Sequence, residues 1–285
     1  MFTGNTFPQG VDLGLAERID ALVRYLNLNY SSVFDLLKKA LLYYINLIQG
    51  FLDLLPWWLL LLLVVAAGRK LRGSWRQGFF FAGLLSFIGL AGYWRMMNET
   101  LAIVLASVSI SLVLGFPAGI VMSMIEDKYL LPLLDAMQTM PTFVYMIPAV
   151  MLLGPGKVPA VLATVIYAVV PVIRLTSHGL RQVNPAVVEA AQAFGSTRWQ
   201  LLWKVLLPQA RSTIMTGVNQ TLLMAVAMVV TCSMIGANGL GMEVLIAINR
   251  TESGRGLIAG LCIVIIAILL DRLTQGLGAR KGGSL

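Results

Sequence analysis

The residues best suited to a chemical task lie in a polar break, about forty residues long, between two uncharged apolar runs. Glu189-Ala190-Ala191 stands in this break and is followed by Gly195 and by Leu207-Pro208. Glu189 offers one fixed charge, and the two small alanines let another surface approach closely. Because a charged segment gains nothing from the lipid interior, this stretch predicts a docking surface for something in the cytoplasm.

Catalytic chemistry finds little support elsewhere in the chain. Segment 154–158 contains two glycines and a lysine, but its spacing is wrong for a phosphate-binding loop and it lacks Ser or Thr. His178 is the only histidine, and no Ser or Cys partner stands at a recognisable spacing. Cys232 and Cys262 both lie inside apolar runs, where a small buried residue is the usual role. We therefore expect no enzymatic activity and no metal or cofactor site in this chain.

Capping residues give the polar break a predicted shape. Asn184-Pro185 is typical of a helix start, because Asn caps free amides and Pro suits the first helical position. Gly195 predicts the end of that helix, since glycine tolerates the left-handed conformation. Thr197 with Gln200 forms a capping-box pattern for a second helix, and Leu207-Pro208 either ends that helix or turns it into the next span. The sequence therefore predicts a helix, a glycine corner and a second helix.

The composition places the chain in a membrane. Of its 285 residues, 58% are hydrophobic and 12% are charged, and the mean hydropathy is +0.82. A soluble domain carries about a quarter charged residues. The formal net charge of +8 would suggest nucleic acid as partner of a soluble protein, but here the positions of the charges matter more than their sum. We expect an all-α membrane protein that binds no nucleic acid.

Charge-free runs predict about seven transmembrane helices, since a spanning helix needs about 20 residues. The shorter runs can borrow flanking residues whose charged heads reach the interface. The runs divide the chain into an N-terminal segment (1–53), two accessory spans (54–95), a core (96–275) that contains the polar break (174–211), and a tail (276–285). The seven runs are 54–68, 77–94, 100–125, 136–156, 158–173, 212–242 and 256–270.

Lysine and arginine set the predicted orientation, because cytoplasmic loops carry an excess of positive residues. These residues crowd the loop after the first run, the polar break and the segment after the last run, whereas the opposite loops hold few. An odd number of spans places the two termini on opposite sides. We therefore expect the polar break and the C-terminus in the cytoplasm and the N-terminus outside.

The N-terminal segment predicts an amphipathic helix at about residues 33–53. Its polar residues fall on one narrow stripe at 100° per residue, and apolar residues cover the rest. Such a helix either lies at the membrane surface or packs on the other spans, and the sequence leaves both open. The polar stripe consists of Asp35, Lys38, Lys39, Asn46, Gln49 and Asp53.

The residues of the polar break resemble those of a known protein family. The spacing of Glu189-Ala190-Ala191, Gly195 and Leu207-Pro208, before the penultimate span, is similar to the cytoplasmic loop of ABC-importer permeases. Over about residues 95–275 the chain resembles the permeases of the glycine betaine, proline betaine and choline group. Stretches 140–145, 217–222 and 271–275 are typical of that group.

The resemblance implies a type I ABC-importer permease fold in a bacterial inner membrane. It also implies a homodimer, two ATPase subunits that bind ATP and Mg on the cytoplasmic side, and a periplasmic substrate-binding protein outside. ATP would close the ATPase subunits, move a coupling helix at 189–195 and expose the path alternately to each side. The residues implied for ATPase coupling are Glu189, Ala190, Ala191, Phe194, Gly195, Arg198 and Pro208.

Polar and aromatic residues within the spans are candidates for the solute path, because quaternary ammonium groups suit aromatic faces. The same residues could instead hydrogen-bond neighbouring spans. Asn219 and Gln220 are the strongest, since two amides are expensive to leave unpaired in lipid. The candidates are Thr139, Tyr145, Asn219, Gln220, Thr231 and Ser233.

Alternatives remain for the solute and for the energy source. Glycine betaine leads, with choline, proline betaine, carnitine, trimethylamine N-oxide and histidine behind it. A different class of function is an ion-coupled secondary carrier or a channel. The charge-free spans argue against a proton-coupled carrier, whereas a sodium site can be built from carbonyl and amide groups.

Overall fold

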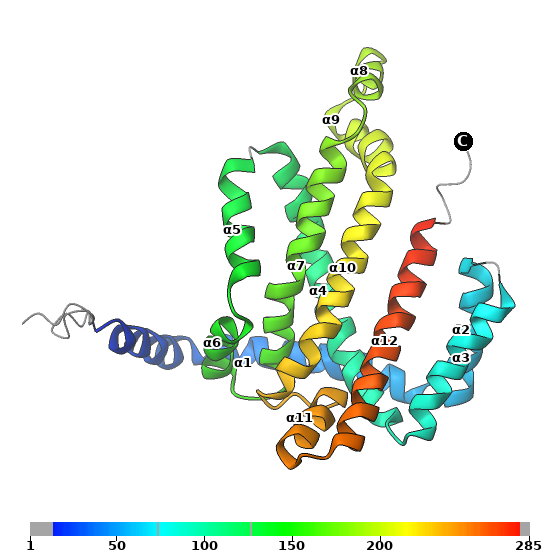
Figure 1. Ribbon diagram of the computed structural model, residues 1–285. Helices are drawn as coiled ribbons and strands as arrows, with labels where there is room; N and C mark the ends of the chain where they lie inside the picture. The colour runs from blue at the N-terminus through cyan, green and yellow to red at the C-terminus, as the bar shows by residue number, and fades with distance from the viewer. Residues whose placement is uncertain (1–13, 73, 126, 280–285) are drawn as a thin grey trace, which may run out of the picture.

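The computed structural model describes residues 14–72, 74–125 and 127–279, and every regular element in these ranges is a helix (Figure 1). Residues 1–13 of the predicted N-terminal segment and residues 280–285 of the predicted tail lie outside the described residues. The helices are α1 Leu15–Leu54, α2 Trp57–Arg72, α3 Trp75–Leu90, α4 Trp94–Met124, α5 Asp127–Thr139, α6 Thr142–Leu153, α7 Lys157–Arg181, α8 Pro185–Ala193, α9 Arg198–Leu201, the π-helical turn η1 Leu202–Leu206, α10 Leu207–Ser233, α11 Leu240–Arg250 and α12 Ser253–Ala279.

Three helices, α4, α7 and α10, pack against one another at the centre of the molecule (Figure 1). The α4–α7 contact is close because Gly115 and Gly119 of α4 face α7. A methyl group added at Gly119 would lie 2.7 Å from Cβ of Thr176 and 2.8 Å from the carbonyl oxygen of Ile173. This confirms the close packing that small residues in membrane helices favour.

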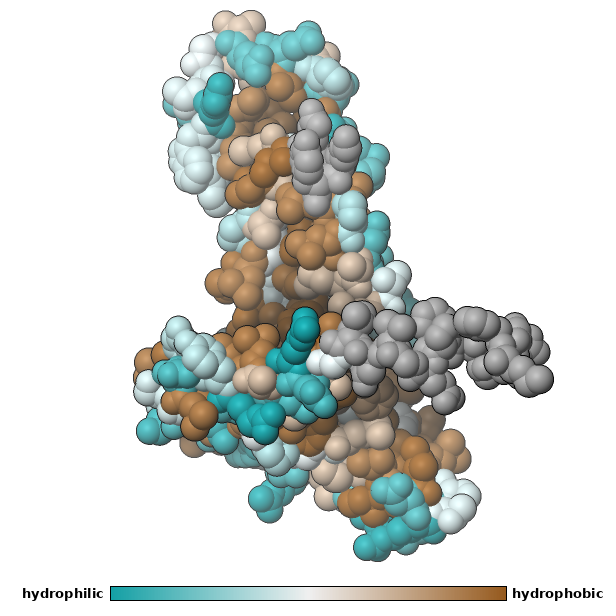
Figure 2. All heavy atoms as spheres, turned by 90° about the vertical axis from the view of Figure 1, so that its left-hand side faces the viewer, coloured by the Kyte–Doolittle hydropathy of each residue, from teal (hydrophilic) through white to brown (hydrophobic). Residues whose placement is uncertain are grey.

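The remaining helices surround this centre. The hairpin of α2 and α3 packs beside α12, α12 packs on α10 and α11, and α5 and α6 pack on α7. Figure 2 shows hydrophobic side chains gathered along the column between the tip that carries α8 and the level of α1, with hydrophilic side chains at both ends. This distribution is what an apolar membrane interior between two aqueous surfaces requires.

The count of about seven spans is only approximate. Among the described residues, four helices are long and apolar enough to cross a membrane: α4, α7, α12 and the continuous helix Arg198–Ser233. The number rises to six if each of two bent helix pairs counts as one span. The first two predicted runs correspond to α2 and α3, which have 16 residues each, fewer than the about 20 that a straight span needs.

Two predicted spans are wrong as single helices. The run 136–156 is broken between Thr139 and Thr142, where Leu130–Thr139 and Thr142–Leu153 meet at 87°. Pro141 stands at this break, and a proline disfavours the helical conformation of the residue before it. The run 212–242 is divided as well, because α10 ends at Ser233 and a turn with positive φ at Gly236 and Gly239 leads into α11.

The amphipathic helix is confirmed, and it is longer than predicted, since α1 begins at Leu15 and spans 40 residues. It runs across the lower ends of α4, α6 and α7 (Figure 1), with Ile45 and Leu52 buried. On another side it leaves large apolar side chains in the open, such as Leu36, which is 70% exposed, and Tyr43, which is 72% exposed. The helix therefore packs on the other spans and also presents an uncovered apolar face.

Candidate functional site

The first helix of the polar break, α8, forms the tip of the molecule (Figure 1). Asn184 caps it as predicted, because its side-chain oxygen Oδ1 accepts a hydrogen bond from the amide of Ala186 at 2.9 Å and Pro185 takes the first helical position. None of the nine residues of α8 is buried. A helix without a fully buried residue gains little stability from its own chain, so its exposed surface is available to a partner.

The glycine corner ends α8 as predicted. Gly195 has φ +79°, in the left-handed region that glycine enters without steric penalty. The amide of Ser196 donates to the carbonyl of Ala191 at 3.1 Å, and the amide of Phe194 donates to the carbonyl of Ala190 at 3.0 Å. These bonds satisfy the last carbonyl groups of the helix and point Phe194 outward, where it is 92% exposed.

The second helix begins with the predicted capping box. Thr197 Oγ1 accepts from the amide of Gln200 at 3.3 Å, and Gln200 Oε1 accepts from the amide of Thr197 at 3.0 Å. Helix α9 then continues through η1 into α10, so Pro208 lies inside one continuous helix. The π-turn makes this possible: the amide of Leu207 donates to the carbonyl of Leu202, five residues back, which widens the helix where the proline ring would otherwise clash.

The tip carries both charge and exposed aromatic surface. Trp199 is 68% exposed, and its ring meets that of Trp203 edge to face at 5.5 Å between centroids. At the base of the tip, an open groove of about 380 Å³ is lined by Glu189 and Val188 of α8, by Leu202 and by the end of α4. Large exposed aromatic residues are enriched where proteins bind one another.

The predicted coupling residues lie in three places. Glu189, Ala190, Phe194 and Gly195 are exposed, and Ala191 is half-buried, at the corner of α8. Arg198 is exposed at the start of α9, whereas the exposed Pro208 lies beyond η1 at the base of the tip.

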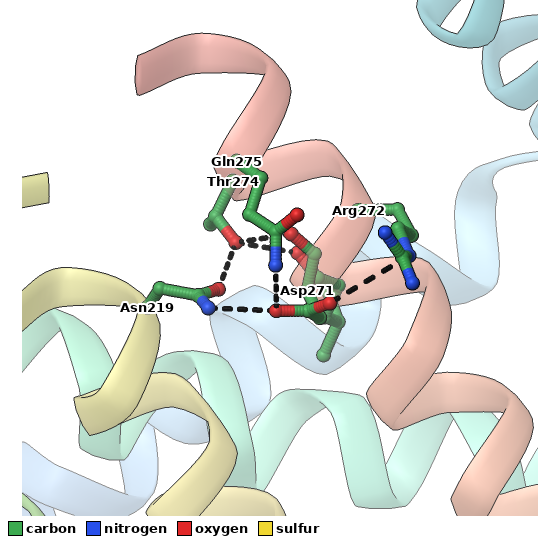
Figure 3. A network of polar contacts seen from close by, with 6 residues as sticks. Asn219, Asp271, Arg272, Thr274 and Gln275 are labelled. Carbon is green, nitrogen blue, oxygen red and sulfur yellow. Dashed lines mark hydrogen bonds and ion pairs between the residues drawn. The ribbon is translucent and has the colours of Figure 1, made fainter. Parts of the chain in front are cut away.

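Among the predicted path residues, Asn219 lies in a polar network between α10 and α12 (Figure 3). Its Nδ2 donates to Oδ1 of Asp271 at 2.6 Å, and its Oδ1 accepts from Oγ1 of Thr274 at 2.6 Å. Gln275 also donates to Asp271 Oδ1, at 2.7 Å. In this arrangement the Asn219 amide forms hydrogen bonds with the neighbouring helix α12, which is the alternative role that the sequence left open.

The other path candidates lie at different levels of the bundle. Tyr145 is 8% exposed and packs in an apolar cluster that includes Cys232, and its hydroxyl has no hydrogen-bond partner among the described residues. Ser233 donates to the carbonyl of Val230 at 2.6 Å. Thr139, beside the break between α5 and α6, donates to the carbonyl of Asp135 at 2.9 Å. Thr231 is half-buried and Gln220 is exposed. Asn219 and Thr231 are separated by roughly 18 Å along α10 at 1.5 Å per residue, so the candidates form an outer and an inner group.

The sequence reasoning missed two paired carboxylates among the described residues, the half-buried Asp271 and the buried Glu243. Asp271 follows the last charge-free run directly, in a stretch that carries the family resemblance, yet its pairing with Asn219 depends on helix packing. Glu243 is 6% exposed in α11 and accepts from Arg255 Nε of α12 at 2.7 Å. The twelve-residue separation of that pair follows from the turn between α11 and α12, which the sequence reasoning did not predict.

Comparison with known proteins identifies the family. Residues 111–282 match the family described as the binding-protein-dependent transport system inner membrane component. The chain is 46% identical over 267 residues to a glycine betaine/carnitine transport permease protein of Listeria monocytogenes, covering 92% of this chain and 94% of the relative. It is 42% identical to a glycine betaine transport system permease protein of Bacillus subtilis, covering 94% and 95%. A glycine betaine/proline betaine permease protein of Escherichia coli is 49% identical over 205 residues, which cover 70% of this chain and 58% of that relative.

Solved structures place the fold. Inward-facing structures of the MetNI methionine ABC transporter superimpose with TM-scores of 0.56 and 0.53 at 22% and 23% identity. They cover 66% and 64% of this chain and 93% and 90% of the solved chains. This confirms the type I ABC-importer permease fold. The chain therefore belongs to the inner membrane components of binding-protein-dependent transport systems, the permease subunits of ABC importers.

Proposed function

We propose that the chain, as a homodimer, forms the translocation path of an ABC importer for a small quaternary-amine osmolyte, with glycine betaine first among them. The names of three relatives at 42–49% identity, from three organisms, include glycine betaine. Other relatives are named for trimethylamine N-oxide or carnitine, and both solutes also carry a methylated nitrogen. A binding protein outside the membrane delivers the solute in this proposal.

The observation that carries the mechanism is the tip formed by α8 and α9. None of the residues of α8 is buried, and Phe194 and Trp199 are exposed. The tip joins α10 through an unbroken helix. We assign this surface to a partner ATPase subunit, which binds ATP and Mg. A displacement of the tip passes into α10, because the helix between them has no flexible loop, and α10 packs on α4, α7 and α12. The ATPase supplies the difference in free energy between the inward and outward states.

This assignment sets the orientation of the chain. The α8 tip and the end of α12 lie at the same end of the bundle (Figure 1), so both are placed in the cytoplasm. Helices α1, α6 and α11 lie at the opposite end (Figure 1) and face the binding protein, which leaves the N-terminus outside. The positive residues of the polar break support this direction.

The solute path follows the two groups of polar residues along α10. Tyr145, Thr231 and Ser233 serve the outer group, with Thr139 at the break between α5 and α6, and Asn219 and Gln220 serve the inner group. The support for Tyr145 is its buried hydroxyl, which has no hydrogen-bond partner among the residues that the structure describes, because such groups are rare and need an explanation. A quaternary ammonium group passing its ring would gain cation–π attraction.

Substitution of Glu189 tests the coupling surface. We expect Glu189→Lys and Gly195→Asp to abolish most uptake of radiolabelled glycine betaine in cells, with the permease still present in the membrane. The matched control is Glu17→Lys, an equal charge change on the exposed first turn of α1, which should transport normally. Normal uptake by Glu189→Lys and Gly195→Asp would remove the assignment of the tip to the ATPase.

Competition distinguishes the solutes and the energy source. Unlabelled glycine betaine should suppress uptake most strongly, followed by choline, proline betaine, carnitine and trimethylamine N-oxide, whereas histidine should have no effect. Suppression by histidine alone would overturn the substrate proposal and leave the coupling result intact. Uptake that continues in vesicles without ATP, but with an ion gradient, would establish a secondary carrier instead.

A further inference from the structure

A cavity of about 570 Å³ lies at the elbow between α1 and α2, at the opposite end of the molecule from α8. The two helices meet at 93°, and the outer end of α3 and the start of α4 close the cavity. Its walls hold one carboxylate, Asp53, and two indole rings, Trp57 and Trp94. The other lining residues are mostly apolar and include Leu61 and Leu90.

Asp53 carries a negative charge that this part of the chain does not neutralise. Its Oδ1 accepts from Asn98 Nδ2 at 2.8 Å and its Oδ2 accepts from Gln49 Nε2 at 3.5 Å, and both donors are neutral. The nearby ammonium of Lys157 donates to Gln49 Oε1 at 2.6 Å. No described residue forms an ion pair with Asp53. A carboxylate beside apolar walls interacts more strongly with a cation than it would in water, so the cavity favours a positively charged occupant.

The two indoles add attraction for the same kind of group. Tryptophan has the best ring face for a cation, and organic ammonium groups are recognised by aromatic walls. Trp57 is 62% exposed, and the ring of Trp94 lies against Gly89, where an added Cβ would be 3.4 Å from its Cε3 atom. One carboxylate and two indoles are the chemistry that binds an alkylammonium ion.

The surroundings indicate that this ammonium belongs to a lipid. The elbow joins α1, which has an uncovered apolar face, to the apolar hairpin of α2 and α3. Leu54 beside the cavity is 81% exposed, and Leu90 in its wall is 89% exposed, so an acyl chain leaving the cavity meets apolar surface. We infer that this elbow binds one phospholipid with an ammonium headgroup, with the ammonium at Asp53, Trp57 and Trp94 and an acyl chain along Leu61 and Leu90.

Native mass spectrometry of the full chain in detergent tests the inference. The probes are dioleoyl phosphatidylethanolamine and dioleoyl phosphatidylglycerol, which share acyl chains and differ in the ammonium group. We expect one phosphatidylethanolamine per chain to be retained in preference to phosphatidylglycerol. Asp53→Asn should weaken this retention about fivefold, as loss of one charge interaction at an exposed side chain does, and it keeps an oxygen acceptor for Asn98. Trp57→Leu should weaken it to a similar degree.

Asp35→Asn is the matched control. Asp35 and Asp53 lie eighteen residues apart on α1, which is five helical turns and hence the same face, but Asp35 does not line the cavity. Retention must survive this change. Equal retention of the two lipids, or an Asp53→Asn chain and a Trp57→Leu chain that both bind phosphatidylethanolamine normally, would overturn the inference. Displacement of the lipid by millimolar choline would also overturn it and assign the cavity to a free solute. If Asp53→Asn fails to fold, Trp57→Leu alone decides the outcome, because its exposed side chain contributes little to folding.

Discussion

Replacement of Gly195 tests how far transport depends on the backbone of the corner between α8 and α9. At φ +79°, an L-residue pays roughly 1–2 kcal/mol that glycine does not. Asparagine enters this region more readily than alanine, and β-branched residues enter it least. A Cβ atom built at this position has no neighbour within 4 Å. The free-energy penalty of a substitution therefore comes from the backbone conformation and not from a clash at Cβ.

This free-energy penalty should change the conformation of the tip and leave the stability of the helix bundle unchanged. A change of 1–2 kcal/mol shifts the population of the observed corner by about five- to thirtyfold, at tenfold per 1.4 kcal/mol. Because no residue of α8 is fully buried and only Val188 packs against a neighbouring apolar cluster, the corner can change shape while the packing of the bundle stays in place. We therefore expect uptake to fall in the order Gly195, Gly195→Asn, Gly195→Ala, Gly195→Val, at an unchanged midpoint of thermal unfolding.

Uptake of labelled glycine betaine, normalised to the amount of permease in the membrane, checks this order, and light scattering or fluorescence gives the unfolding midpoint. Gly83→Ala is the control, since its Cβ also meets nothing within 4 Å and Gly83 has no left-handed φ. A ranking by side-chain size would place Gly195→Ala above Gly195→Asn. That result, or wild-type uptake by Gly195→Val, would refute the backbone argument.

Two further predictions concern the packing of the bundle. Gly119→Ala should lower the free energy of unfolding by about 1–3 kcal/mol, because its new methyl group would lie 2.7 Å from a neighbouring side chain; a thermal midpoint equal to that of Gly83→Ala would contradict this. Asn219→Leu removes two hydrogen bonds to α12 and should destabilise the chain by about 1 kcal/mol, at roughly 0.6 kcal/mol per bond, while Asp271 keeps its contact with Gln275. A double-mutant cycle with Asp271→Asn measures this coupling, and additive effects would show that the two residues do not interact.

Local signals in the sequence were sufficient for the polar break. Asn184, Gly195, Thr197 and Gln200 each act on backbone groups within five residues, so their roles do not depend on the rest of the fold. The same signals could not choose between the two outcomes for Leu207-Pro208. That choice depends on the π-turn of η1, which carries the proline within a continuous helix.

Features that depend on chain direction or on distant contacts could not be predicted in this way. A charge-free run reports where lipid is tolerated and not where the backbone bends, which is why the break at Pro141 was missed. The pairing of Asn219 with Asp271 joins residues 52 positions apart, and no local pattern encodes that contact.

The π-turn of η1 also makes the number of residues between the tip and the membrane helix important. In a flexible loop, one residue more or less changes only the reach of the chain. In an unbroken α-helix each residue turns the chain by about 100°, so a one-residue deletion in α10 just after the wide turn would rotate Glu189 and Phe194 about the axis of α10. The wide turn of η1 therefore helps to set the rotational orientation of the tip about the axis of α10, and so the direction in which the tip meets its partner.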